Sequence, residues 1–518
     1  MSSLKVCRNV RLNNKYEHTI FFTDHSERDA YFDNKVVATF ENLSYLRKKW
    51  NIKVQASYTS ARSWNYAFTE DATHPRYYYF ITEVNYISDT TVELVLELDV
   101  MITYIHMYQI NKSFVERNHV VDDTIGKHTV EESIDIGEIV TYADVSVPLN
   151  SLAVVILSSV HPSQLDSDGK PLKEFGQIVG GVFSGLCLYG IQLSDYQILG
   201  TWLDEMSKNG TIDNIVTMWM YPKNLLHING EWGETPFVDV LGVDPLEVNY
   251  HRTDTNGDYK PRNNKLLTYP FKFMYLTNNA GNACTYRYER FSNPASINFK
   301  LTGAVSPSDS VRMYPKNYNG EKDAYESGLT LGTYPTCAWS SDTYKLWLAQ
   351  NQNQNNLAYA TAGLTIAGGL ATTLSTAGIG GVAGVGAMVA GASQIASLLA
   401  QNKDREIQPK QSKGSYSGSI NIMAGFQTFT LKHKGVSTEF AKIIDDYFDM
   451  YGYRLNRLML PRIHARENWS YVKTIEANVS GNIPNDDLDK IKSIYDNGIT
   501  FWVDGDEIGN YALPNNPI

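Results

Sequence analysis

The chain has 518 residues, which is enough for two to four domains with buried cores. Its 45 Lys and Arg residues stand against 56 Asp and Glu residues, so the net charge is −11 and the usual basic nucleic-acid binder is excluded. With 19% charged residues, the average composition also excludes an integral membrane protein.

Tyrosine and cysteine usage indicates the fold class and the compartment in which the protein is assembled. The 34 tyrosines and 12% aromatic residues favour β-strands, because flat rings pack well on a pleated surface. The N-terminus shows no apolar stretch of the kind found in a secretory signal peptide. The cysteines lie far apart without a CxxC pair, so we expect inert thiols in a protein assembled in a reducing cytosol. They are Cys7, Cys187, Cys284 and Cys337.

The first strong pattern is a long antiparallel hairpin, predicted over Arg76 to Tyr108 with a turn at Ser88 to Thr90. Its second arm alternates with period two, which predicts one buried face. The two faces are Val92, Leu94, Leu96 and Leu98, and Glu93, Val95, Glu97 and Asp99. Further strands are expected at Ser151 to Val160, Gly185 to Leu193 and Ile215 to Pro222, with a turn cluster at Asp166 to Gly169.

Helices are expected to be short and late in the chain. One is predicted from Thr438 to Tyr451, closed by Gly452, and another from Asp486 to Asn497, with Asn485 as N-cap and Gly498 after it. The expected apolar faces are Phe440, Ile443, Ile444, Tyr447 and Tyr451, and Leu488, Ile491, Ile494 and Tyr495. The fold class that follows is mainly β with a few helices.

The most unusual feature is the absence of any charged residue from Leu346 to Asn402, where the average frequency would place roughly eleven. A Gln and Asn run opens this gap, and the uncharged segment proper, Leu357 to Ala400, contains 12 Ala and 9 Gly in 44 residues. A turn at Gly378 to Gly381 divides it into two arms that, as helices, would each span roughly 28 to 30 Å, close to a bilayer core. We therefore expect a long hydrophobic hairpin loop.

The composition of the uncharged segment argues against membrane insertion of a single copy. Bulky apolar residues are sparse, so one arm would insert poorly alone, whereas small residues allow several copies to pack closely. A buried core hairpin, a flexible linker and a constitutive membrane anchor stay open as alternatives to a stored, conditionally membrane-active loop. The predicted membrane-active residues are Leu357, Leu364, Ile366, Leu370, Leu374, Gly378, Ile379, Gly380, Gly381, Val382, Val385, Met388, Val389, Ile395, Leu398 and Leu399.

Motifs for catalysis, metals and cofactors are weak. Gly378, Gly380 and Ala383 match a dinucleotide fingerprint, but no βαβ unit is predicted around them. Asp254 to Asp258 begins like a calcium loop, but Tyr259 stands where glycine is required, so a surface turn is expected. The histidines show no metal-ligand spacing. We predict no catalytic residue, no metal site, no cofactor and no enzyme.

Four parts of the chain carry a resemblance to a known family. In chain order they are Phe80 to Tyr104 continued by Ser113 to His128, then Pro261 to Phe271, Thr333 to Gln354, and Gly481 to Trp502. Together with the position of the uncharged segment, they resemble the tail-knob, or distal tail-tube, proteins of short-tailed phi29-like bacteriophages. The resemblance covers nearly the whole chain, although residues 161–250 contain no stretch that matches.

This resemblance implies a ring-forming, usually hexameric, structural subunit with β-barrel tube modules, located in the tail of the virion. The implied segments are an N-terminal tube module (1–160), a knob-like outer insertion (161–260), a second part of the tube (261–345), the uncharged loop (346–402) and a C-terminal α+β part (403–518). It also implies loops that plug the lumen and then penetrate the host membrane during genome ejection.

The implied partners are further copies of the chain, other tail proteins such as the collar or upper tube and a tail-tip lysin, the host cytoplasmic membrane, and viral DNA passing without sequence-specific contacts. Two other functions remain open on the residues alone. A Tyr-rich β protein is compatible with a tail-tip adhesin or cell-wall-degrading protein, and the uncharged segment with a holin-like protein.

Overall fold

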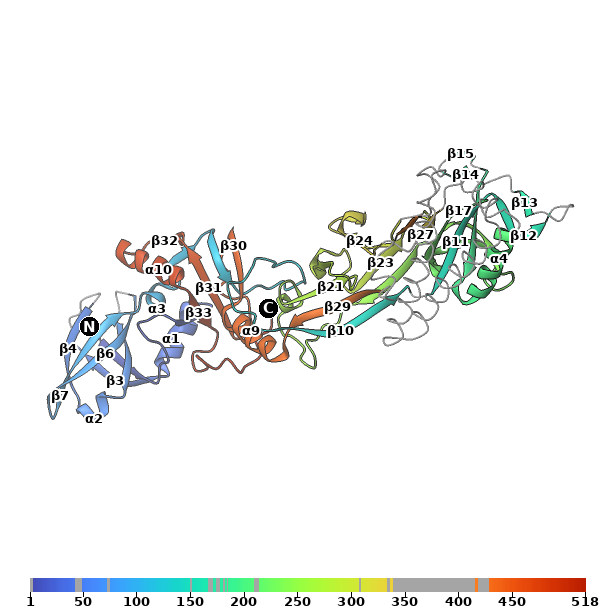
Figure 1. Cartoon of the computed structure of the whole chain (residues 1–518). Coiled ribbons are helices and arrows are strands. Elements are labelled where there is room, and N and C mark those ends of the chain that lie inside the picture. Colours follow the sequence, from blue (N-terminus) through green and yellow to red (C-terminus); the bar gives the residue numbers. More distant parts are fainter. Residues whose placement is uncertain are drawn as a thin grey trace, which may run out of the picture. The chain divides into compact units, whose positions relative to one another are not determined.

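The structure is a computed structural model (Figure 1). It describes residues 3–41, 49–71, 75–149, 151–165, 171–173, 178–179, 182–183, 185–208, 214–306, 309–332, 336–338, 415–417 and 428–518. The chain forms two compact units, and each is discontinuous in sequence. Unit 1 comprises Met1–Ile139, Asp254–Phe271 and Val436–Ile518, and unit 2 comprises Val140–Thr253 and Lys272–Gly435.

Unit 1 contains two main sheets. The first has the order β3-β1-β5-β6-β7-β4. Its strands are β1 (Ser3–Arg8), β3 (Val36–Glu41), β4 (Lys49–Gln55), β5 (Trp64–Glu70), β6 (Tyr77–Ser88) and β7 (Thr91–Leu98). The second has the order β2-β33-β31-β9-β30, and β8 pairs separately with β32. These strands are β2 (His18–Ile20), β8 (Tyr108–Ile110), β9 (Ser113–Asn118), β30 (Tyr453–Met459), β31 (Trp469–Ile475), β32 (Val479–Gly481) and β33 (Ile499–Trp502).

The predicted β6–β7 hairpin is confirmed over most of its length. Strand β7 alternates as expected, with Val92, Leu94, Leu96 and Leu98 all buried. The prediction that the strand continues to Tyr108 is wrong, because Val100–Tyr104 forms helix α3. Asp99 causes this change: its carboxylate accepts the Met101 and Ile102 amides at 3.0 and 3.2 Å and so caps the helix.

Helices occur early as well as late in unit 1, contrary to expectation. They are α1 (His25–Asp33), α2 (Tyr58–Ala61), α3, α9 (Thr438–Tyr451) and α10 (Asn485–Asn497), together with the 3₁₀ turn η4 (Asn264–Leu267). Helix α10 packs against β31 and β32 (Figure 1). The early helices are short, and each begins at a capping side chain: Asp24 for α1, Ser57 for α2 and Asp99 for α3.

The two late helices match their predicted ranges, with corrections in detail. Helix α9 ends at Gly452, whose φ of 64° suits glycine. Of the predicted apolar face, Ile444 is buried as expected but Ile443 is 62% exposed. The buried residues of α9 are Ala441, Ile444, Asp445 and Phe448. The predicted N-cap Asn485 is the first residue of α10, and Pro484 precedes it without a side-chain cap. The apolar stripe therefore identified each helix but not every detail of its face or cap.

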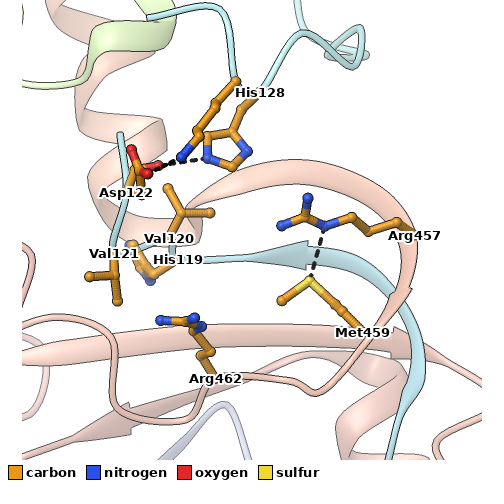
Figure 2. Close-up of a pocket in the computed structure, with 9 residues that line it drawn as sticks. His119, Val120, Val121, Asp122, His128, Arg457, Met459 and Arg462 are labelled. Carbon is orange, nitrogen blue, oxygen red and sulfur yellow. Dashed lines mark hydrogen bonds and ion pairs between the residues drawn. The ribbon is translucent and has the colours of Figure 1, made fainter. Parts of the chain in front are cut away.

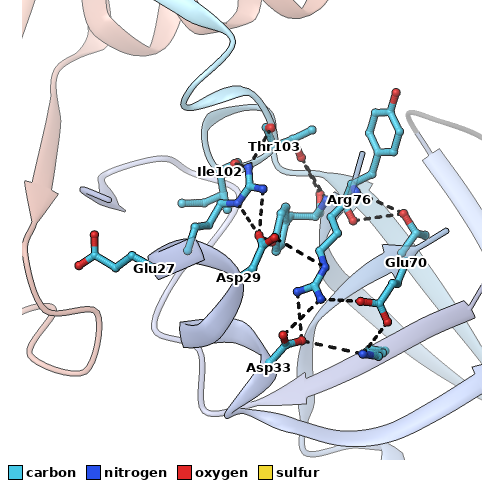
Figure 3. A network of polar contacts seen from close by, with 12 residues as sticks. Glu27, Asp29, Asp33, Glu70, Arg76, Ile102 and Thr103 are labelled. Atoms are coloured by element: carbon cyan, nitrogen blue, oxygen red, sulfur yellow. Dashed lines mark hydrogen bonds and ion pairs between the residues drawn. The ribbon is translucent and has the colours of Figure 1, made fainter. Parts of the chain in front are cut away.

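A polar network fastens α1 to the first sheet (Figure 3). The Arg76 guanidinium donates to Asp33 at 3.0 and 3.2 Å and to Glu70 at 2.5 Å. Lys5 contributes a 2.6 Å ion pair to Glu70. These carboxylates are more than a third exposed, so the network positions the helix more than it stabilises the fold.

Unit 2 is built from a large sheet of order β18-β19-β16-β11-β17-β27-β28. Its strands are β11 (Leu152–Ser158), β16 (Cys187–Gln192), β17 (Ile215–Pro222), β18 (Leu226–Asn229), β19 (Phe237–Val243), β27 (Thr336–Ala338) and β28 (Ser415–Ser417). The three strands predicted from apolar runs are confirmed as β11, β16 and β17. The turn cluster expected at Asp166 to Gly169 lies outside the described residues.

Smaller sheets complete unit 2. One has the order β10-β29-β21-β22, formed by β10 (Ile139–Pro148), β21 (Lys272–Thr277), β22 (Ala283–Tyr286) and β29 (Thr428–Val436). Another contains β20 (Leu246–His251), β23 (Ser296–Thr302), β24 (Arg312–Tyr318), β25 (Glu321–Asp323) and β26 (Leu329–Thr330). Two short pairs are β12 (Val160–Leu165) with β13 (Pro171–Lys173), and β14 (Ile178–Val179) with β15 (Val182–Phe183).

The helical elements of unit 2 are α4 (Tyr196–Lys208) and the 3₁₀ turns η1 (Leu193–Asp195), η3 (Lys223–Leu225), η5 (Tyr288–Arg290) and η6 (Tyr325–Ser327). The mainly β fold class with a few helices is thus confirmed. Cys7, Cys187 and Cys284 are free thiols, and burial raises the pKa of Cys7 to about 12, which makes it unreactive.

Candidate functional site

The residues predicted to be membrane-active, from Leu357 to Leu399, lie outside the described residues. None of the helices described here is both long and apolar enough to cross a membrane. Within the same described part, no group of three or more His, Cys, Asp or Glu side chains could hold a metal ion. The candidate sites described below lie on the second sheet of unit 1 and in the segments next to it.

Three cations face one another across the adjacent strands β30, β9 and β31. Arg454 pairs in register with Arg117, and Arg117 pairs with Lys473. Like charges directly opposite on a sheet repel, so each requires compensation. Lys473 has Glu116 at 2.9 Å, and Arg117 donates to Glu132 and to the Gly452 carbonyl at 2.6 Å.

Glu132 is the central counter-charge of this region. Its side chain is fully buried, and its two oxygens accept from Arg117, from Lys265 and from the Arg454 amide at 2.9 Å. Burial lowers the pKa of Lys265, although Glu132 opposes that shift. One carboxylate thus joins β9, β30 and the segment containing η4, and removing it would leave two buried cations unpaired.

A second buried carboxylate, Asp445 on α9, organises the neighbouring segment. It accepts the Tyr259 hydroxyl at 2.7 Å, the Arg262 amide at 2.6 Å and the Asn263 amide at 3.0 Å. Asn256, in the expected surface turn, is fully buried, and its Nδ2 donates to the Val436 carbonyl at 3.2 Å. The surface-turn prediction is therefore wrong at Asn256, because this loop packs into unit 1.

A tyrosine-lined cleft of about 460 Å³ lies beside the cation row. Tyr447, Tyr451 and Tyr471 form one wall, with Tyr451 between the other two at ring-centre distances of 5.1 Å. The Arg117 guanidinium lies 4.8 Å from the Tyr447 ring centre, within range of a cation–π interaction. Burial raises the pKa of Tyr471 to about 12, so its hydroxyl stays protonated at neutral pH. The cleft offers flat apolar faces and positive charge.

Figure 2 shows a smaller hollow of about 230 Å³. It is lined by the segment after β9 and by the end of β30 with the loop that follows. The lining residues are His119, Val120, Val121, Asp122, Lys127, His128, Arg457, Met459 and Arg462. Asp122 is ion-paired with Lys127, which holds the pKa of Asp122 well below its ordinary value. The hollow therefore keeps a net positive lining.

The histidines at this hollow have structural hydrogen bonds. His119 accepts the Tyr471 amide through Nδ1 at 2.7 Å and donates through Nε2 to the Asp449 carbonyl at 2.9 Å. Burial lowers the pKa of His119 to about 3, so the ring is neutral. Burial also lowers the pKa of His128, whose Nε2 donates to the Asp122 carbonyl at 2.8 Å. Neither ring is a free base.

Sequence reasoning missed the cation row and both hollows. The strands involved come from residues 113–118 and 453–475, so no local pattern brings their cations together. The spacing of Arg454 and Arg457 within one strand is the only local signal, and it is common on solvated strand faces.

Comparisons with known proteins agree over the whole chain. Residues 241–516 match the family model of the C-terminal domain of the tail knob protein gp9 of Bacillus phage phi29, and residues 1–109 match that of the caudoviral major tail protein N-terminus. The chain is 22% identical to the tail knob protein gp9 of Bacillus phage phi29 and 23% identical to that of Bacillus phage PZA. Each match covers 99% of this chain and 98% of the relative.

Among solved structures, the tail knob protein gp12 of bacteriophage C1 is similar, with a TM-score of 0.67, 16% identity and full coverage of both chains. At that identity the likeness shows a shared fold. The phi29 family model, in contrast, spans more than half of this chain and includes the β30–β31 region and both late helices. The chain therefore belongs to the phi29 tail knob protein gp9 family and is a structural component of a phage tail.

Proposed function

We propose that copies of this chain assemble into a ring, usually of six, that forms the distal tail tube, and that the uncharged segment Leu357–Ala400 first plugs the tube and then penetrates the host membrane. The observation that carries the proposal is the 57-residue charge gap in a chain that otherwise aligns end to end with tail knob proteins. A tail protein that only built a wall would have no reason to keep so long a segment free of charge.

The composition of the segment supports storage followed by release. Each arm is long enough to span a bilayer core of roughly 30 Å, but its small residues make insertion of one copy weakly favourable. Several copies from one ring could pack closely through small residues such as Gly380 and Gly384 and insert together. In this proposal, oligomerisation makes membrane insertion favourable where a single chain would insert only weakly.

In this proposal the segments 1–160, 261–345 and 403–518 build the tube and 161–260 forms the outer knob. Other tail proteins, such as the collar and a tail-tip lysin, adjoin the ring, and viral DNA passes through it without sequence-specific binding. A net charge of −11 supports such passage, because a chain without a basic excess gives a polyanion few sites to bind.

The test compares the full chain with a variant lacking Leu357–Ala400 and with a matched variant in which these 44 residues are replaced by a Gly/Ser linker of equal length. Electron microscopy should show rings for all three proteins. Only the full chain should release dye from liposomes, because the linker has the length but not the apolar surface. Equal release by all three would refute the membrane role, and the absence of rings would refute the tube.

A further inference from the structure

The hollow of Figure 2 contains two arginines with no acidic partner. The guanidinium groups of Arg457 and Arg462 enter it from two sides. Among the described residues, the only side-chain hydrogen bond of Arg457 is to the Met459 sulfur, at 3.2 Å, and the Arg462 side chain forms none. Asp122 does not compensate them, since Lys127 already neutralises it. Two positive charges therefore share one hollow.

The backbone is bent at the residue that directs Arg457 into this hollow. The pairing of β30 with β9 shifts between Arg454 and Arg457, which is a β-bulge. Asn456, within the bulge, has a φ of 44°, a left-handed conformation that side-chain-bearing residues seldom adopt. Bulges of this kind redirect side chains and are frequent next to functional sites.

Arg462 is held in place through its backbone rather than its side chain. Asn118, which is fully buried, accepts the Arg462 amide at 2.8 Å and donates to the Arg462 carbonyl at 2.9 Å. The same Asn118 amide donates to the Tyr471 carbonyl at 2.7 Å, which ties this position to β31. The Arg462 backbone is therefore fixed at the rim of the hollow, and its guanidinium has no partner among the described residues.

We propose that this hollow binds a phosphate group, held between the guanidinium groups of Arg457 and Arg462. Two guanidinium forks that approach from different segments suit a tetrahedral oxyanion with three or four acceptor oxygens better than a flat carboxylate with two. The volume of about 230 Å³ exceeds that of a phosphate ion and leaves room for a small attached group. The phosphate source is a free ion or a small phosphoester.

The experiment uses the full chain and isothermal titration calorimetry with inorganic phosphate, glycerol 3-phosphate and acetate at constant ionic strength. The variants are Arg457→Gln and Arg462→Gln, and Arg462→Lys tests whether a point charge can replace the fork. Arg62→Gln is the matched control, because Arg62 is also exposed and its side chain has no partner among the described residues. Thermal melting confirms that each variant is folded.

We expect inorganic phosphate to bind the full chain and the Arg62→Gln control equally, and each Arg→Gln change in the hollow to weaken binding about tenfold. Acetate should bind more weakly than phosphate. Tighter binding of glycerol 3-phosphate would identify a phosphoester as the source, and tighter binding of phosphate would identify the free ion. Equal affinities of the full chain and the Arg457 and Arg462 variants, or of acetate and phosphate, would overturn the proposal.

Discussion

The interiors of the two units differ in how they are held together. Nine charged side chains are buried in the described part of the chain, and eight of them belong to unit 1: Arg28, Asp99, Arg117, Glu132, Lys265, Asp445, Arg466 and Asp487. The ninth is Lys272, the residue at which the chain returns from unit 1 to unit 2. Unit 2 is filled by one aliphatic and aromatic cluster, whereas unit 1 combines its buried charges with two apolar clusters.

This difference predicts different weaknesses. Buried charges that satisfy one another fix particular strand and loop positions, and they destabilise strongly when one partner is lost. An apolar cluster depends on volume, so it is sensitive to cavities but tolerant of lost hydroxyl groups. Unit 1 should therefore respond more strongly than unit 2 to changes of charge, and unit 2 mainly to changes of size. Burial lowers the pKa of a histidine in each unit, His119 in unit 1 and His433 in unit 2.

The largest effect is expected for Glu132→Ala. Arg117 and Lys265 would remain buried without a counter-charge, so the free energy of unfolding of unit 1 should fall by about 3–5 kcal/mol. Denaturant unfolding followed by peptide-resolved hydrogen exchange would locate the loss. Replacing the three residues together, with Glu132→Leu, Arg117→Met and Lys265→Met, should cost much less. A loss below about 1 kcal/mol for the single variant would contradict the role given to Glu132.

The corresponding change in unit 2 is Leu301→Ala on β23. Leu301 is fully buried in the apolar cluster, so the truncation should cost about 2–5 kcal/mol by leaving a cavity. Hydrogen exchange should increase in unit 2 and not in unit 1. Leu241→Ala is the control, since that leucine is 55% exposed and should change stability little. Equal effects of the two variants would show that this cluster does not determine stability.

Acidification should affect unit 1 through His119. Burial, together with Arg466 and Arg117, keeps its pKa near 3, whereas the unfolded chain has the ordinary value of about 6.5. The unfolded state thus binds the extra proton as the pH falls below 6.5, and stability decreases. The loss from pH 7 to pH 5 should be about 2 kcal/mol.

The measurement is denaturant unfolding at pH 7, 6 and 5 of the parent and of His119→Gln, which cannot titrate in this range. The variant should be less stable at pH 7 but lose less stability on acidification. Parallel pH profiles would show that other groups cause the dependence, among them His128 and His18, whose pKa values burial also lowers.

The smallest change in stability is expected when a tyrosine hydroxyl is removed from unit 2, and removal of one from unit 1 provides the comparison. In unit 2, Tyr250 is buried and its hydroxyl has no hydrogen-bond partner among the described residues, so Tyr250→Phe should change stability by less than about 0.5 kcal/mol. In unit 1, the Tyr453 hydroxyl donates to Asp123 at 2.7 Å, so Tyr453→Phe should cost about 1–3 kcal/mol. Thermal unfolding of both variants measures the two losses of stability. A larger loss for Tyr250→Phe than for Tyr453→Phe would contradict the proposed difference between the units.

Much of the local structure was predictable because it depends on neighbouring residues. Alternation at Val92 to Leu98 identified β7, and apolar runs identified β11, β16 and β17. Stripes ending at glycine identified α9 and α10. The prediction failed at Asp99, where one side chain that caps a helix outweighed the continuing apolar pattern.

The sequence by itself determined the mainly β class, the uncharged segment and the absence of a basic excess, because composition and short-range periodicity encode these directly. Only the tertiary structure decided that Arg117, Glu132 and Lys265 share one buried cluster and that Arg457 and Arg462 share one hollow. Arg117 and Lys265 lie 148 residues apart in the chain, and the hollow brings His119 together with Arg462, 343 residues further along. Their meeting depends on strand register and on a bulge, which no local pattern specifies.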